Sequence, residues 1–113
     1  LLDSHRELIE DVFQCPIFDQ YGSAEQVVFV SQCEAGSYHI HPEFGHIEVI
    51  DDEGKAVSPG ETGKFICTGY TNLAMPLIRY DIGDTGILSD KSCSCGRNFP
   101  VVKKIIGRTD DIL

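Results

Sequence analysis

The sequence predicts a mainly β domain of the α+β class, in which one N-terminal helix precedes a distorted antiparallel, barrel-like sheet. Three observations lead to this prediction. Apolar residues recur at helical spacing only in residues 1–14, the pattern changes to a period of two from residue 45, and turn sequences follow at short intervals. With 113 residues, the chain is long enough for one hydrophobic core and is expected to form a single domain.

The first part of the chain changes from helical to extended character. In residues 1–14, large apolar side chains alternate with charged ones at three- and four-residue spacing, and Pro16 ends the predicted helix. Ile17 and Phe18 predict a short strand, residues 19–25 a polar loop, and residues 27–30 a further strand.

The rest of the chain is expected to form most of the sheet. Pro76 leads into a predicted strand through Leu77 and Ile78, which turns where Gly83 lies between two carboxylates. The other predicted strands cover residues 46–50, 64–68, 86–89 and 101–106, with turns at 51–54 and 59–63. The chain therefore divides into a helix (1–14), a β subdomain (15–106) and a C-terminal segment (107–113).

Composition limits the partners and the compartment. Eighteen acidic and nine basic residues give a formal net charge of −9, which disfavours nucleic acid or an anionic membrane as the main partner. No apolar run approaches the roughly 20 residues of a membrane helix. Of the five cysteines, Cys93 and Cys95 are too close for an unstrained disulfide, so reduced thiols and a cytoplasmic location are expected. The chain starts without methionine, and we expect it to be part of a longer protein.

Two segments suit a nucleotide. In residues 21–25, Tyr21 can stack on a base, Gly22 lets the backbone approach a phosphate, and Glu25 can hold magnesium. Asp84 can accept hydrogen bonds from both hydroxyls of a ribose. The alternatives are that Tyr21 caps the core, Glu25 faces solvent, and residues 81–84 form a solvated turn.

Two loops carry soft metal ligands. Cys93 and Cys95, together with Cys33 and His39, match the four ligands of tetrahedral zinc. His41 competes with His39, because two imidazoles two residues apart in an extended segment lie about two strand rises apart and only one fits. The alternative is that Cys33 is a small buried hydrophobe and the Cys93 loop a reduced surface loop.

The segment 107–111 follows the last predicted strand. A glycine followed by charged residues suits an interdomain hinge, and Arg108 could reach a ribose or phosphate. The alternative is a polar tail.

Taken in order, Tyr-Gly-Ser-Ala-Glu at 21–25, Arg-Tyr-Asp-Ile-Gly-Asp at 79–84 and Gly-Arg-Thr-Asp-Asp at 107–111 resemble the adenylate-forming superfamily of acyl-CoA synthetases. Segments 32–33, 38–39, 75–80 and 93–97 resemble its phenylacetate-CoA ligase branch, including relatives linked to capsular polysaccharide synthesis. The similarity covers residues 17–113. It implies part of the large domain of a ligase that adenylates a small carboxylic acid with ATP and then forms a thioester, usually with coenzyme A.

The resemblance also implies roles for individual residues. Tyr21 would stack on adenine, Glu25 would be catalytic by binding Mg²⁺, Asp84 would hold the ribose with help from Arg108, and Asp110 would be the hinge. The remaining expected nucleotide-binding residues are Asp19, Gly22 and Ser23, and the expected ligands of a structural Zn²⁺ are Cys33, His39, Cys93 and Cys95.

Two departures from the family pattern concern the nucleotide. Ala24 stands where many relatives have a hydroxyl before the magnesium-binding glutamate, and Asp19 stands where many have asparagine. The phosphate loop and the catalytic lysine are expected outside residues 1–113, so the isolated chain is expected to be inactive. The alternative function is a zinc-stabilised, non-catalytic binding or scaffold module in polysaccharide biosynthesis.

Overall fold

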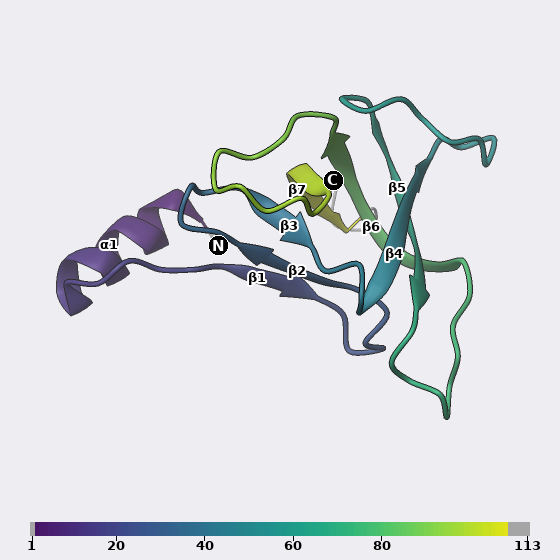
Figure 1. Cartoon of the computed structure of the whole chain (residues 1–113), viewed down its shortest axis with the longest axis horizontal. Helices are drawn as coiled ribbons and strands as arrows, with labels where there is room; N and C mark the ends of the chain where they lie inside the picture. Colours follow the sequence, from purple (N-terminus) through teal and green to yellow (C-terminus); the bar gives the residue numbers. More distant parts are fainter. Residues whose placement is uncertain (1, 109–113) are drawn as a thin grey trace.

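The computed structural model describes residues 2–108 as one helix followed by a seven-stranded antiparallel sheet (Figure 1). Helix α1 spans Asp3–Phe13, and the strands are β1 (Gln20–Gly22), β2 (Phe29–Gln32), β3 (Tyr38–Ile40), β4 (Gly45–Ile50), β5 (Thr62–Gly69), β6 (Tyr80–Ser89) and β7 (Val101–Arg108). The strand order is β1-β2-β3-β7-β6-β5-β4. Two meanders, β1–β3 and β4–β7, are therefore joined where β3 pairs with β7. The mainly β prediction with one N-terminal helix is confirmed for the described residues.

The predicted barrel-like closure is wrong. Strands β1 and β4 are the two edges of an open sheet and do not pair with each other in residues 2–108. The segment between β1 and β2 packs across this gap instead: Val27 and Val28 are buried, and a Cβ added at Gly45 would collide with the carbonyl of Val27. Side-chain and backbone packing thus replaces the hydrogen-bonded ladder that would close a barrel.

The hydrophobic core lies between the two meanders. Phe65 is fully buried at its centre, and its ring occupies the space that a side chain at Gly86 would need. The other buried core residues are Val27, Val28, Val30, Ile40, Ile47, Val49, Cys67, Ile82 and Val102. Because they come from both meanders, burial of this apolar surface holds the curved sheet together.

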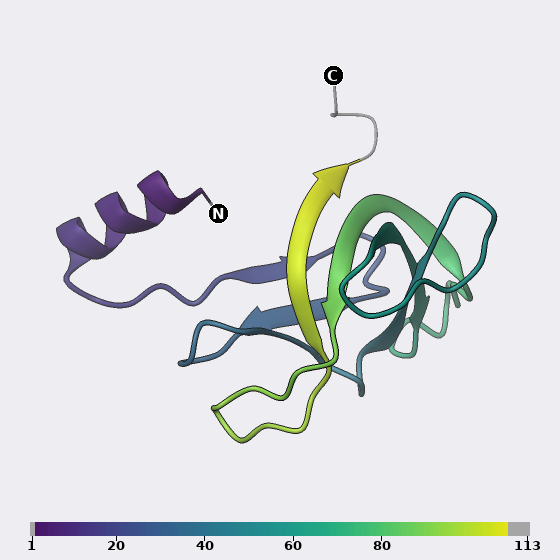
Figure 2. The same ribbon diagram turned by 90° about the horizontal axis from the view of Figure 1, so that it is seen from above.

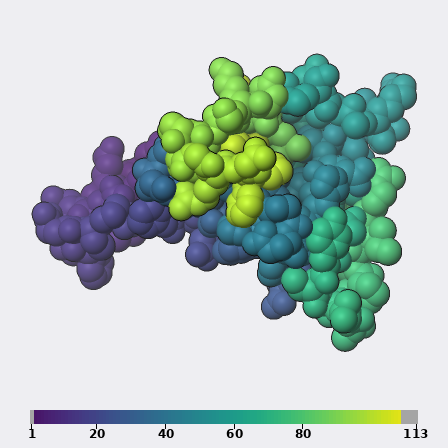
Figure 3. Space-filling model, viewed as in Figure 1, coloured from purple at the N-terminus to yellow at the C-terminus, as the bar shows by residue number. Residues whose placement is uncertain are grey.

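Helix α1 projects away from the sheet and buries none of its described residues (Figures 1 and 3). Arg6 connects it to the sheet by donating to the carbonyl of Ile17 at 2.7 Å and to Oε1 of Gln32 at 2.8 Å. The strand predicted at Ile17 and Phe18 is not formed. The backbone N–H of Ile17 donates to Glu10, so helix side chains bind the backbone groups that a strand ladder would have used.

Strand β6 differs most from the prediction. Leu77 and Ile78 lie outside any strand, because Arg79 adopts a left-handed conformation with φ of 50° and the strand begins only at residue 80. Gly83 is not a terminal turn. It lies within β6 with φ of 79°, in a bulge against β5. Asp84 therefore lies inside the sheet rather than at the end of a strand.

The remaining elements follow the sequence pattern. The strands predicted over 46–50, 64–68 and 101–106 are confirmed and are one to three residues longer in the structure. Figure 2 shows β6 and β7 curving side by side. No helix in the described part of the chain is long and apolar enough to cross a membrane.

Candidate functional site

Tyr21 and Asp84 meet across the sheet although they are 63 positions apart in sequence. The Tyr21 hydroxyl donates to Oδ2 of Asp84 at 2.6 Å. Its ring packs edge-on against Phe65, with a centroid distance of 6.3 Å and an interplanar angle of 72°. Burial, followed by the hydrogen bond to Asp84, raises the pKa of Tyr21, so the phenol keeps its proton. Tyr21 therefore caps the core, as the alternative interpretation expected, and also orients the carboxylate.

Glu25 is connected to the same pair through Arg108, whose charge acts on both Glu25 and Tyr21. The Tyr80 hydroxyl donates to Oε1 of Glu25 at 3.1 Å. The hydrogen bond from its own backbone N–H, then that from Tyr80, and the positive charge of Arg108 lower the pKa of Glu25, so this carboxylate is ionised at neutral pH. Arg108 is the register partner of Asp84 between β7 and β6. Three separate sequence motifs thus contribute to one cluster, which we call the carboxylate cluster. Its members are Tyr21, Glu25, Asp84 and Arg108.

Asp19, Gly22 and Ser23 flank the carboxylate cluster. Asp19 accepts a hydrogen bond from the Tyr38 hydroxyl at 3.0 Å, and a cavity of about 330 Å³ lies between Asp19, Tyr21, Tyr38 and the β7 residues 103–105. Gly22 ends β1 and is exposed. The hydroxyl of Ser23 is buried near Glu25 and helps to lower its pKa without reaching full hydrogen-bond geometry. Asp110, the predicted hinge, lies outside the described residues.

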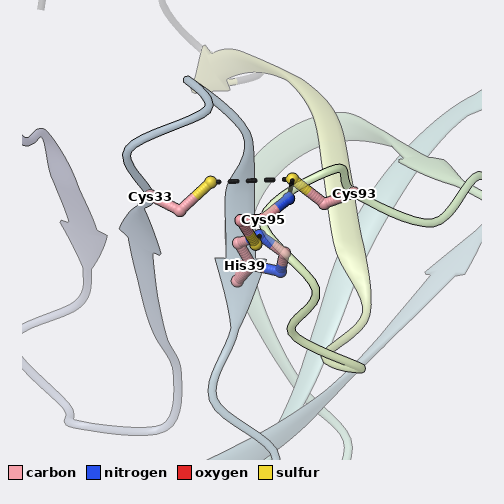
Figure 4. Close-up of side chains that lie close together, drawn as sticks. All are labelled: Cys33, His39, Cys93 and Cys95. Atoms are coloured by element: carbon pink, nitrogen blue, oxygen red, sulfur yellow. Dashed lines mark hydrogen bonds between the residues drawn. The ribbon is translucent and has the colours of Figure 1, made fainter.

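The four predicted metal ligands converge. The donor atoms of Cys33, His39, Cys93 and Cys95 all lie within 4.8 Å of one another, and Figure 4 shows their side chains pointing inward from two loops and β3. The Cys33 and Cys93 sulfurs are 3.6 Å apart, and the Cys95 sulfur is 3.4 Å from Nε2 of His39. Tetrahedral zinc, with bonds of about 2.3 Å to sulfur and 2.0 Å to nitrogen, requires ligand separations of about 3.5–3.8 Å. The donor set therefore fits zinc, and we call it the metal cluster.

Surrounding groups prepare these ligands. Nδ1 of His39 faces the carbonyl of Phe99 at 3.4 Å, which leaves Nε2 directed toward the sulfurs. Hydrogen bonds from the Ser37 side chain and from the Cys95 N–H lower the pKa of Cys93 to about 6, whereas burial raises the pKa of Cys33. A thiolate is the form that binds a metal ion.

His41 is directed away from the metal cluster. Its Nε2 lies 2.8 Å from the Ser31 hydroxyl and its Nδ1 lies 3.1 Å from Oε1 of Glu43. The choice left open between His39 and His41 is therefore resolved in favour of His39 on geometry. Cys67 is buried in the core, where burial raises its pKa to about 12, so it does not belong to either cluster.

Three contact residues were not assigned from sequence. Tyr80 donates a hydrogen bond to Glu25. Its even spacing from Asp84 puts both residues on one face of a strand, and this spacing could have indicated Tyr80 from the sequence. Gln32 and Tyr38 both contact Asp19. Each immediately precedes a predicted metal ligand. Their contacts with Asp19 span 13 and 19 positions in sequence, and a contact over that separation leaves no local sequence pattern.

The chain is similar to known proteins over part of their length. No protein-family model matches the chain. Phenylacetate-coenzyme A ligase of Thermus thermophilus is 43% identical over 67 residues, which are 58% of this chain and 15% of that protein. Protein CapK of Staphylococcus aureus is 32% identical over 114 residues, which cover 100% of this chain and 24% of that protein.

Solved structures give the same relationship. 2-Hydroxyisobutyryl-CoA ligase in an open conformation, in complex with 2-HIB-AMP and CoA, matches 97% of this chain with a TM-score of 0.84 and 25% identity. The same enzyme in the postadenylation state, with R3-HIB-AMP, matches 94% of it with a TM-score of 0.83 and 26% identity. The chain spans at most a quarter of the length of these proteins, 25% and 24% of the two ligase chains.

Proposed function

Because this chain is related to phenylacetate-CoA ligase, to CapK and to an adenylate-forming acyl-CoA ligase over part of their length, we propose that it is the nucleotide-holding sheet of an ATP-dependent carboxylate-CoA ligase. Such an enzyme joins a carboxylic acid to AMP and then transfers the acyl group to the thiol of coenzyme A. The sheet alone is not expected to turn over, because it supplies only part of the ATP site.

The contact between Tyr21 and Asp84 carries this proposal. An ionised carboxylate has two oxygens and about four acceptor positions, and the Tyr21 hydroxyl uses one of them. The remaining positions can accept both hydroxyls of a ribose. Arg108, opposite Asp84 in the sheet, brings a positive charge to a cluster that otherwise contains two carboxylates. Asp84 would hold the ribose and Arg108 would assist it, with the ring of Tyr21 beside the adenine.

Glu25 would hold Mg²⁺, whose charge offsets the charge of the phosphates. Its lowered pKa keeps the carboxylate in the ionised form that a hard cation requires, and the Tyr80 hydroxyl donates to its Oε1. Ala24 contributes no hydroxyl at the neighbouring position, so this chain would contact the phosphates through a cation held by Glu25 and through backbone groups at Gly22 and Ser23.

Cys33, His39, Cys93 and Cys95 would hold zinc. Four protein ligands complete a tetrahedral site and leave no open position for substrate, so this zinc is structural. Its contribution is a cross-link between loops rather than chemistry on the acid.

ATP-pyrophosphate exchange by the full-length protein, over a panel of aryl and acyl acids, tests the proposed function. We expect exchange with at least one acid, and the variant Asp84→Asn should raise the KM for ATP by at least about tenfold, equivalent to about 1.4 kcal/mol of lost binding. Asp90→Asn, at an exposed carboxylate just after β6, is the matched control and should leave the KM unchanged. Equal effects of the two substitutions would contradict the role of Asp84.

The second candidate is a non-catalytic, metal-stabilised binding or scaffold module. Two observations favour it: the metal cluster is complete within the described residues, and position 24 lacks the hydroxyl. This candidate predicts retention of one zinc per chain with no exchange for any acid and no binding of AMP by calorimetry.

A further inference from the structure

The two meanders of the sheet are connected by a short joint. Strands β3 and β7 pair at only two positions, Tyr38 with Val102 and His39 with Val101. One further backbone hydrogen bond, from the Ile40 N–H to the carbonyl of Pro100 at 2.9 Å, extends the contact. By comparison, β4 and β5 pair at every residue from Gly45 to Ile50. The β3–β7 joint is therefore paired over fewer residues than β4 and β5 are.

Both clusters span this joint. The metal cluster takes Cys33 and His39 from the first meander and Cys93 and Cys95 from the loop before β7 (Figure 4). The carboxylate cluster takes Tyr21 and Glu25 from the first meander and its remaining members from β6 and β7. Any displacement of one meander against the other would thus change both.

Two side chains link the clusters directly. Gln32, which precedes Cys33, accepts the backbone N–H of Asp19 at 3.3 Å and donates to the carbonyl of Gly36 at 3.1 Å, inside the loop that carries Cys33. Tyr38, which precedes His39, donates to Oδ2 of Asp19 at 3.0 Å. Asp19 is thereby held from two positions adjacent to metal ligands, and it lies two residues before Tyr21.

We propose that metal binding at Cys33, His39, Cys93 and Cys95 sets the geometry of the nucleotide site across the β3–β7 joint, with Gln32 and Tyr38 as positioning residues. The proposal rests on the proposed function for the identity of the nucleotide. Four metal-ligand bonds would fix the loop before β7 to β3 and to the loop after β2. Without these bonds, only the short β3–β7 ladder and the hydrophobic core connect the two meanders. Gln32 and Tyr38 would then no longer be held in position, and neither would the segment 19–22 that they contact through Asp19.

The direct test compares the metal-loaded and chelator-stripped full-length protein. Amide hydrogen exchange reports the joint, and calorimetric titration with AMP reports the nucleotide site. We expect stripping to speed exchange in residues 19–22 and 38–40 by at least about tenfold and to weaken AMP binding by a similar factor. Faster exchange confined to residues 91–97, with unchanged AMP affinity, would overturn the proposal.

The two readouts separate this inference from the proposed function. If the loaded protein binds no AMP, the proposed function fails, whereas the exchange comparison still decides whether the metal orders the segment 19–22. If AMP binds equally well with and without metal, the proposed function stands and the coupling is wrong.

Variants test the positioning residues with the metal in place. Tyr38→Phe removes only the hydroxyl and Gln32→Leu removes only the amide contacts, so both should retain one zinc per chain by metal analysis. We expect each to speed exchange at residues 19–22 and to weaken AMP binding by about three- to tenfold. Gln32→Glu keeps the acceptor for Asp19 but loses the donor to Gly36, so it should weaken AMP binding about as much as Gln32→Leu. Tyr70→Phe, at a half-exposed tyrosine far from Asp19 in the sheet order, is the matched control. If Tyr38→Phe and Gln32→Leu behave like this control, neither residue positions the site.

Discussion

The metal cluster and the carboxylate cluster span the same joint but differ in how they are built. His39 and Cys33 in the metal cluster are buried, with 2% and 8% exposure, and their donors point at a common centre. In the carboxylate cluster, Glu25 and Asp84 are half-buried, and each accepts one hydrogen bond from a tyrosine. In the metal cluster, the converging donor atoms suit a metal ion that stays bound. In the carboxylate cluster, two carboxylates are oriented by tyrosines and keep acceptor positions for a ligand that binds reversibly.

The largest expected effect is loss of the metal. His39→Ala should lower the free energy of unfolding by at least about 4 kcal/mol, the value for a ligand present at a thousand times its Kd that binds only the folded state. His41→Ala removes an imidazole two residues away that lies outside the metal cluster, and it should retain the metal. Urea denaturation at saturating zinc measures both. Equal midpoints for His39→Ala and the unmodified protein would show that the metal cluster does not stabilise the fold.

The contact across the joint in the carboxylate cluster should contribute less. Tyr21→Phe keeps the packing against Phe65 but removes the donor to Asp84, and we expect a loss of about 1.5 kcal/mol, because the carboxylate is half-buried and regains part of its hydration. Denaturation of the metal-loaded protein provides the measurement. A loss as large as that of His39→Ala would mean that both clusters are structural.

The bulge at Gly83 gives a smaller effect that separates stability from ligand binding. Gly83→Ala meets no steric contact but forces a φ of 79° on an L-residue, which costs about 1 kcal/mol. Gly54→Ala has the same φ and the same open surroundings in the turn after β4. Both should lose similar stability, but only Gly83→Ala should weaken AMP binding, because it adjoins Asp84. Equal AMP affinities would show that the bulge does not position the carboxylate.

The smallest effect concerns pH in the metal-free protein. The pKa of Cys93 is lowered to about 6 from an ordinary value of 9.0, so its thiolate stabilises the fold fully above pH 9 and this contribution is lost as the pH falls through 6. Cys67 has the opposite shift, to about 12, and stays protonated over this range. Thiolate absorbance at 240 nm should titrate with a midpoint near 6 and disappear in Cys93→Ser. If the unmodified protein and Cys93→Ser show the same absorbance change near pH 6, the hydrogen bonds to Cys93 from Ser37 and Cys95 are contradicted.

Local patterns predicted the parts of the fold that local forces control. Alternation predicted β4, in which buried and less buried residues alternate. A short apolar run between turn sequences predicted β5, in which Phe65, Ile66 and Cys67 are all buried, and a similar run predicted β7. The same reasoning failed around residues 77–84. A glycine between two carboxylates reads as a turn, and only the register of β5 against β6 shows that Gly83 forms a bulge within a continuous strand.

The sequence by itself determined which groups are available: four soft metal ligands on two loops, a tyrosine and two carboxylates in ordered motifs, and strands with an apolar face. Residue type and spacing along the chain suffice for these, because they depend on neighbours a few positions away. Only the tertiary structure decided that the sheet stays open, that His39 rather than His41 joins the cysteines, and that Tyr21 meets Asp84. These outcomes depend on how two meanders pack over one core, and that packing involves contacts between residues 60 positions or more apart, which no local pattern encodes.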